Sequence, residues 1–178
     1  MNFLELVQKR QSTRTYLSRP VDREKIDRCI DAARLAPSAC NSQPWSFVIV
    51  DDPEKKQELA ENAFSGIYSI VSAAKQAPVI IAVVTEKATY AARLGSFLKG
   101  TAYSLIDIGI AGEHLVLQAA EEGLGTCWIG WFNEKKVKKT LGLPRSSHVD
   151  ILITMGYPAD PAIRDKNRKT LEEIRKYS

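Results

Sequence analysis

The sequence predicts one layered domain in which helices cover a β-sheet. The run 78–85 is continuously apolar and rich in β-branched residues, which is typical of a strand buried on both faces. Residues 101–122 form a longer apolar stretch, which predicts a buried helix. Further strands are expected at 46–51, 126–132 and 149–157. Helices between strands fit either an α/β or an α+β arrangement, and periodicity does not choose between them.

The size of the chain fits a single domain over residues 1–178. With 178 residues, of which 44% are hydrophobic, the chain can bury a full core. It contains no internal repeat, low-complexity segment or linker. The first residues lack the apolar core of a signal peptide, and Asp107 and Glu113 argue against a membrane span. We therefore expect a cytoplasmic protein that does not enter a membrane.

Four helices are expected before the central strand and the long helix. The first spans 2–9, and the second spans 22–36, with Asp22 as its N-terminal cap and Pro37 as its stop. The other two are a polar helix and a weaker one, at 53–62 and 65–76.

The helix at 101–122 is apolar on nearly all sides, so it should be covered on nearly all sides. Two arrangements remain open. Either it is the central helix of a monomeric core, or a second subunit covers part of it. Gly109 and Gly112 would let another backbone come close.

Cysteine, histidine and charge exclude several classes of site. The three cysteines and two histidines have no metal-ligand spacing, so neither a zinc site nor an iron–sulfur cluster is expected. Much of the net charge of +4 lies in 9–19, 135–145 and 164–176, which we interpret as solvated helix faces. No aromatic residues interleave with the run 135–145, which argues against nucleic-acid binding. An anionic cofactor would use a few of these charges.

The first motif that suggests chemistry is the segment RQSTR at 10–14. In an extended conformation Arg10, Ser12 and Arg14 share one face, because side chains alternate along a strand. Guanidinium groups bind phosphate oxygens in a bidentate way, so this face suits a phosphate with a polar chain or ring. The alternative is favourable charge at the end of a helix.

The second motif is PSACNSQPW at 37–45, a polar loop between two prolines. The amides of Asn41 and Gln43 both donate and accept hydrogen bonds, so they match the edge of a heterocycle. Trp45 would anchor the loop in the core. The alternative is an ordinary connector.

The third motif is GLGTCWIGWF at 123–132. Gly123 would end the long helix, and Gly130 would allow a flat ligand to approach the backbone. The glycine spacing does not fit a dinucleotide-binding GxGxxG loop. The alternative is a buried aromatic strand.

In order and spacing, these motifs resemble the nitroreductase-like family of FMN-dependent oxidoreductases, in its short, single-domain form, along the whole chain. The segment 168–174, RKTLEEI, is similar to the family's C-terminal phosphate-binding stretch. The resemblance implies an α+β fold with a central mixed or antiparallel sheet flanked by helices. It also implies an intertwined homodimer with one FMN in each of two interface clefts.

The resemblance also implies roles for individual residues. Arg10 and Arg168, with Lys169, would hold the FMN phosphate, and Ser12 would bond to the flavin or its ribityl chain. Arg14 would lie near the N1/O2 edge of the flavin. The backbone of Trp128, Ile129 and Gly130 would run beside the ring. The other subunit would contribute Ser38, Asn41 and Gln43.

The implied activity is transfer of two electrons from NADH or NADPH through FMN to a small oxidant, such as a nitroaromatic or a quinone, with ping-pong kinetics. No side-chain acid or base is needed, so no catalytic residue is assigned. The alternatives are another flavin reaction on the same scaffold, such as dehalogenation or ring oxidation, and a flavin-binding or redox-sensing protein without turnover. Relatives often have proline where Thr170 stands and a small residue where Trp131 stands. Candidate pocket aromatics are Tyr68, Tyr90, Phe97 and Trp131.

Overall fold

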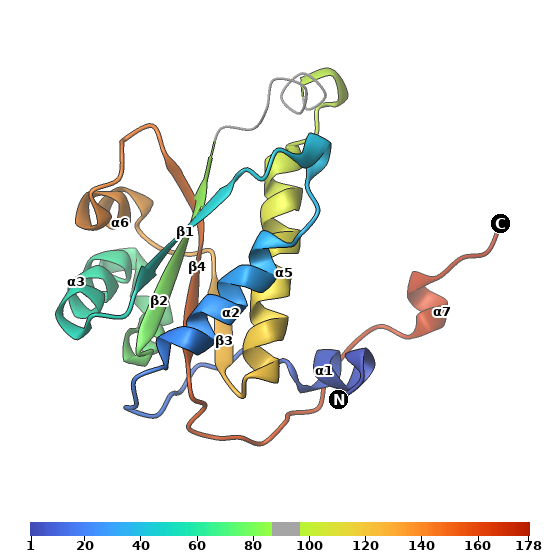
Figure 1. Ribbon diagram of the computed structural model, residues 1–178, viewed down its shortest axis with the longest axis horizontal. Coiled ribbons are helices and arrows are strands. Elements are labelled where there is room, and N and C mark those ends of the chain that lie inside the picture. The colour runs from blue at the N-terminus through green and yellow to red at the C-terminus, as the bar shows by residue number, and fades with distance from the viewer. Residues whose placement is uncertain (87–96) are drawn as a thin grey trace.

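The computed structural model describes residues 1–86 and 97–178, and its central feature is a four-stranded antiparallel sheet (Figure 1). The strands lie in the order β1-β2-β4-β3, and each pairs antiparallel with its neighbours. Their bounds are β1 Trp45–Val50, β2 Val79–Thr85, β3 Gly125–Ile129 and β4 His148–Gly156. With helices on both sides, this sheet makes the fold α+β, and its described strands are antiparallel rather than mixed.

Helices cover both faces of the sheet (Figure 1). On one face lie α2 (Arg23–Arg34) and α5 (Tyr103–Glu121), and on the other lie α3 (Pro53–Ala63) and α6 (Glu134–Leu141). β2 supplies both cores because its side chains alternate, with Ile81 facing α5 and Ile80 facing α3. The prediction of a doubly buried central strand at 78–85 is confirmed.

The remaining elements are short. They are α1 (Phe3–Lys9), the 3₁₀ turn η1 (Ala39–Asn41), the 3₁₀ segment η2 (Gly66–Gln76) and α7 (Leu171–Ile174). The weak helix predicted at 65–76 is thus a 3₁₀ segment, interrupted at Val71. Asp22 precedes α2 as predicted, but its side chain makes no capping bond and instead accepts a hydrogen bond of 3.2 Å from the Tyr157 hydroxyl.

The long helix α5 is covered on only part of its surface by its own chain. One side is buried, including Ile108 and Leu115, whereas Leu105 and Ile106 are each about half exposed. Gly123, with φ of +75°, follows the end of the helix, and the Leu124 amide donates to the Ala119 carbonyl at 2.8 Å, which closes the last turn. In the described ranges, no helix is long and apolar enough to cross a membrane.

Candidate functional site

Around Ser12, the N-terminal segment 10–16 lies beside β3. Ser12 forms a parallel bridge with Thr126, and the Thr13 amide donates to the Thr126 carbonyl at 2.8 Å. This close approach requires a glycine in β3, because a Cβ built at Gly125 would lie 2.3 Å from Oγ1 of Thr13. Backbone contacts therefore fix the segment that carries the two arginines.

A buried tyrosine, Tyr16, also holds this segment in place. The Tyr16 hydroxyl donates to the Thr13 carbonyl at 2.7 Å and lies 2.8 Å from Oγ1 of Thr154 in β4. Burial raises the pKa of Tyr16 well above its ordinary value of 10.0, so the hydroxyl keeps its proton even at alkaline pH. Sequence reasoning missed this anchor, because a single tyrosine in a polar segment carries no periodic signal.

Three cations from the two ends of the chain gather beside α1. Nζ of Lys166 donates to the carbonyl oxygens of Val7 at 2.6 Å and Arg10 at 2.5 Å. Burial lowers the pKa of Lys166, and the positive charges of Arg10 and Arg168 lower it further. Like charges held together in this way favour an anion between them. Sequence reasoning assigned Arg10 and Arg168 to a phosphate but missed Lys166.

A single carboxylate approaches Arg10 within the described part of the chain. Oε1 of Glu113 in α5 lies 3.9 Å from Nε of Arg10, at the outer limit of an ion pair, and its side chain is about half exposed. This contact is weak. The guanidinium of Arg10 therefore keeps most of its capacity to bind an anion.

The C-terminal arm is tied to the N-terminal segment by side-chain bonds. Arg164 donates from Nη2 to the Ser12 carbonyl at 2.5 Å and from Nε to Oε1 of Gln11 at 3.0 Å. Gln11 in turn donates to the Ala162 carbonyl at 2.8 Å. Together the two segments and the end of α5 enclose a cavity of about 240 Å³ that Arg10 lines. Arg168 and Lys169, farther along the arm, are exposed.

A second cavity brings Arg14 together with the end of β3. It measures about 220 Å³, and its wall includes Arg14, Trp128, Ile129 and Gly130. β3 ends at Ile129, so Gly130 lies outside the strand that was predicted to reach 132, and it is exposed. The structure thus brings together four of the predicted site residues around one small, partly apolar space.

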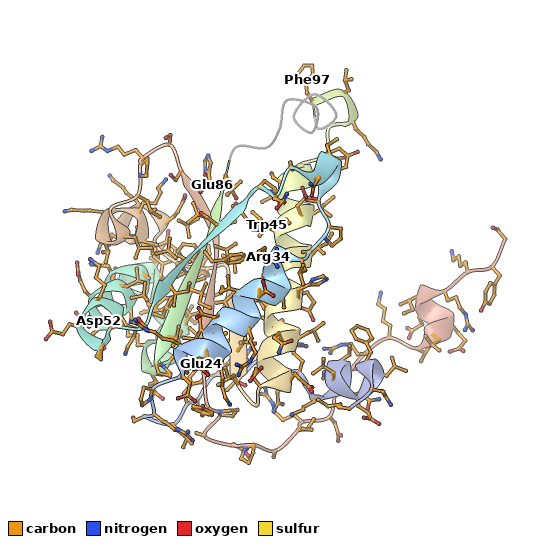
Figure 2. All side chains as sticks on the ribbon, viewed as in Figure 1. Glu24, Arg34, Trp45, Asp52, Glu86 and Phe97 are labelled. Atoms are coloured by element: carbon orange, nitrogen blue, oxygen red, sulfur yellow. The ribbon has the colours of Figure 1, made fainter. Side chains whose placement is uncertain are left out.

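Trp131 connects this cavity to η2. Its indole Nε1 donates to the Ile67 carbonyl at 3.2 Å, and its ring lies 5.2 Å from the ring of Tyr68. Trp131, one of the candidate pocket aromatics, therefore forms part of the cavity wall. Phe97, in contrast, is 84% exposed and lies beyond the N-terminal end of α5 (Figure 2). The fourth candidate, Tyr90, lies outside the described residues.

The polar loop 38–43 has an unusual backbone. Cys40, Asn41 and Gln43 all have positive φ, at 52°, 50° and 44°. Each such residue costs about 1–3 kcal/mol when it is not glycine, and clustered strain of this kind is typical of functional loops. Oγ of Ser38 accepts a hydrogen bond of 2.9 Å from the Gln43 amide. Trp45, labelled in Figure 2, packs against the core as predicted.

The loop does not meet the two arginines within one chain. Neither of the cavities lined by Arg10 or Arg14 is lined by Ser38, Asn41 or Gln43. The Ala39 amide instead donates to Oδ1 of Asp107, near the N-terminal end of α5, at 3.0 Å. One chain therefore presents two separate sets of candidate ligand-binding groups.

These parts favour a ligand with two chemical ends. The cationic cluster suits a phosphate, and the cavity at Arg14 suits a flat polar ring. The loop amides suit a ring edge that has both donors and acceptors.

Comparisons with known proteins agree with this description. The model of the nitroreductase family matches residues 7–157. A candidate NADH dehydrogenase/NAD(P)H nitroreductase of Methanothermobacter thermautotrophicus is 30% identical, over 93% of this chain and 82% of its own length. Iodotyrosine deiodinase 1 of Rattus norvegicus is also 30% identical, over 97% of this chain and 68% of its own. A solved FMN-dependent nitroreductase of Clostridium difficile is 28% identical, with a TM-score of 0.72, over 96% of this chain and 94% of its own.

Proposed function

Because the chain belongs to the nitroreductase family, we propose that it is an FMN-dependent oxidoreductase that moves two electrons from NAD(P)H to a small oxidant by a ping-pong mechanism. The observation that carries the proposal is the cluster of Arg10, Lys166 and Arg168, in which Nζ of Lys166 is bonded to the carbonyl of Arg10. Burial, and then the positive charges of Arg10 and Arg168, lower the pKa of Lys166. A cluster of cations beside a cavity for a ring is the arrangement that a flavin mononucleotide requires.

The phosphate end of FMN fits the cationic cluster. Arg10 and Arg168 would bind the phosphate oxygens, together with Lys169. Lys166 would add a further positive charge close to Arg10. Ser12, on the same extended segment as Arg10, would bond to the ribityl chain. Each charge-assisted hydrogen bond contributes about 1.5–3 kcal/mol, so the cluster accounts for a large part of the affinity.

The ring end of FMN fits the cavity at Arg14. The guanidinium of Arg14 would stabilise negative charge that develops on the ring. The backbone at Trp128, Ile129 and Gly130 would orient the ring and keep water from one side of it. Bound FMN itself supplies the ability to take up a hydride from NADH or NADPH and pass electrons on. The protein needs to supply only position and charge.

We propose further that the protein is a homodimer with FMN at the subunit interface. α1 buries none of its residues, and Phe3 and Leu4 are largely exposed. Beyond Lys166 the C-terminal arm leads away from the body of the chain, and it carries α7, which is exposed throughout (Figure 1). Apolar residues on unsupported segments cost free energy in water, and a second copy would cover them.

The dimer also explains why the polar loop and the arginines are separate in one chain. In an interface cleft, Ser38, Asn41 and Gln43 of one subunit would reach the FMN held by Arg10 and Arg14 of the other. Leu105 and Ile106 on the exposed side of α5 would lie within the interface. Light scattering of the purified protein tests this, since a monomer at micromolar concentration would contradict it.

Reductive dehalogenation is a second candidate. It is favoured by the 30% identity to an iodotyrosine deiodinase over 97% of this chain. Release of iodide from iodotyrosine, measured beside nitroaromatic and quinone reduction, separates the two activities.

The first test is the visible spectrum of the purified protein, before and after NADH or NADPH is added without oxygen. Flavin bands that bleach within seconds support the proposal, and the faster nucleotide identifies the donor. Flavin bands that persist with both nucleotides favour a protein that binds flavin without this turnover. A colourless protein that takes up no added FMN overturns the proposal.

A further inference from the structure

Asp107 is a buried carboxylate on the core-facing side of α5. Asp107 is 3% exposed, and the next residue in the helix, Ile108, is also buried. Oδ1 accepts the Ala39 amide at 3.0 Å, whereas Oδ2 is buried with no hydrogen-bond partner among the described residues. A buried carboxylate on an apolar face costs free energy, so its presence calls for a function.

The bond to Asp107 is what ties the strained loop to the rest of the chain. Within the described residues, the other hydrogen bonds of 38–43 lie inside the loop or join it to Trp45, two residues after its end. Three residues of this loop have positive φ, and such a conformation persists only where its surroundings hold it. The Ala39 amide is at the start of η1, directly after Ser38. A contact there fixes the position of the whole turn.

We propose that Asp107 is a positioning residue of the flavin site, which holds the loop in the conformation that presents Ser38, Asn41 and Gln43 to FMN. This inference rests on the proposed function. Asp107 does not touch the flavin and acts through the Ala39 amide. Only one of its two carboxylate oxygens is used, so an asparagine, which keeps one acceptor oxygen, should preserve the contact.

The experiment compares Asp107→Leu and Asp107→Asn with the wild-type protein. The leucine has the same number of side-chain heavy atoms, branched at the same position, but no acceptor, so the loop should lose its conformation. We expect Asp107→Leu to raise the Kd for FMN at least tenfold and to shift the absorption bands of bound flavin. Asp107→Asn should stay within threefold of wild type. The matched control is Ile108→Val, which removes one methylene from the same turn of α5 and should leave both readouts unchanged.

Hydrogen exchange of a peptide covering 37–45, measured without flavin, tests the contact itself. Exchange should be at least tenfold faster in Asp107→Leu than in Ile108→Val. Should Asp107→Leu not fold, Asp107→Ser serves instead, because its hydroxyl is too short to reach the amide. If Asp107→Leu folds and its hydrogen exchange, its Kd for FMN and its flavin spectrum all match those of the wild type, the role of Asp107 is overturned but the proposed function is not. A wild-type protein that binds no FMN overturns the proposed function, and the role of Asp107 in it.

Discussion

The indole of Trp128 lies where a side chain at position 112 would stand. A Cβ built at Gly112 in α5 would be 2.3 Å from Cη2 and 2.7 Å from Cζ2 of Trp128 in β3. The sequence suggested that Gly112 lets another backbone approach, and the structure corrects this, because an aromatic ring fills the space. Gly109, by contrast, has nothing within 4 Å of a built Cβ and remains available for such a contact.

Gly112→Ala should therefore destabilise the protein. Alanine favours a helix by about 1 kcal/mol over glycine, but overpacking costs about 1–3 kcal/mol. Because the built Cβ comes within 2.3 Å of the ring, we expect the upper part of that range and a net loss of about 2 kcal/mol. Urea unfolding measures it. In the double variant with Trp128→Phe the smaller ring relieves the clash. The loss of unfolding free energy in the double variant should therefore be less than the sum of the losses in the two single variants. Strict additivity would show that the ring does not oppose the methyl group.

Tyr16→Phe should loosen the segment that carries Arg10 and Arg14. Removing the hydroxyl leaves the Thr13 carbonyl without its 2.7 Å donor in a buried place, which costs about 1–3 kcal/mol. The matched control is Tyr157→Phe, whose 3.2 Å bond to Asp22 is exposed and should cost less than 0.5 kcal/mol. Urea unfolding and the Kd for FMN should both respond in Tyr16→Phe. If Tyr16→Phe loses no more unfolding free energy than Tyr157→Phe, Tyr16 does not hold this segment in place.

Much of the site could be predicted, because its signals are local. The polar loop was predicted from its prolines and amides. Arg10 and Arg14 line different cavities, so a shared face for Arg10, Ser12 and Arg14 stays a prediction. What failed is non-local. Lys166 joins Arg10 only because a chain end more than 150 residues away folds back, and no periodicity encodes such a contact.

The fold was predicted to a similar extent and for the same reason. The strands and the long helix follow from hydrophobic periodicity. The choice of α+β was left open by the pattern, because the order of strands in a sheet depends on contacts between distant segments. The end of β3 at Ile129 was missed because the apolar residues continue beyond it, and Trp131 and Phe132 leave the sheet to pack elsewhere.

The unfolding free energy should fall at alkaline pH because of Cys29. This thiol is fully buried, and burial, followed by the charge of Glu122, raises its pKa to about 12 from 9.0. Above pH 9 the unfolded chain releases the proton and the folded chain keeps it, so stability decreases by up to about 1.4 kcal/mol per pH unit. Cys29→Ala should show a shallower decrease between pH 9 and 11. Parallel profiles for the two proteins would exclude a contribution from Cys29.

Arg10→Ala should weaken FMN binding by about 1.5–3 kcal/mol, or roughly 10–150-fold in Kd. It should also raise the pKa of Lys166, because one of the positive charges that lower it is removed. Fluorescence titration with FMN measures the first effect, and NMR of the lysine side chains measures the second. Arg34→Ala, at an exposed pair with Asp31, is the control and should change neither. Equal affinities for FMN in Arg10→Ala and wild type would show that this cluster does not bind the phosphate.

Arg14→Ala should make the bound flavin harder to reduce. A guanidinium beside the ring stabilises the negative charge that reduction creates, so its loss should lower the midpoint potential. A loss of about 1.4–3 kcal/mol corresponds to about 30–60 mV for a two-electron couple. Anaerobic spectroelectrochemistry measures the potential directly. Arg14→Lys keeps the charge and should recover most of the shift, whereas Arg34→Ala should leave the potential at its wild-type value. An unchanged potential in Arg14→Ala would mean that the guanidinium lines the cavity without acting on the ring, and the tuning of the flavin would then have to come from the backbone at Ile129 and Gly130.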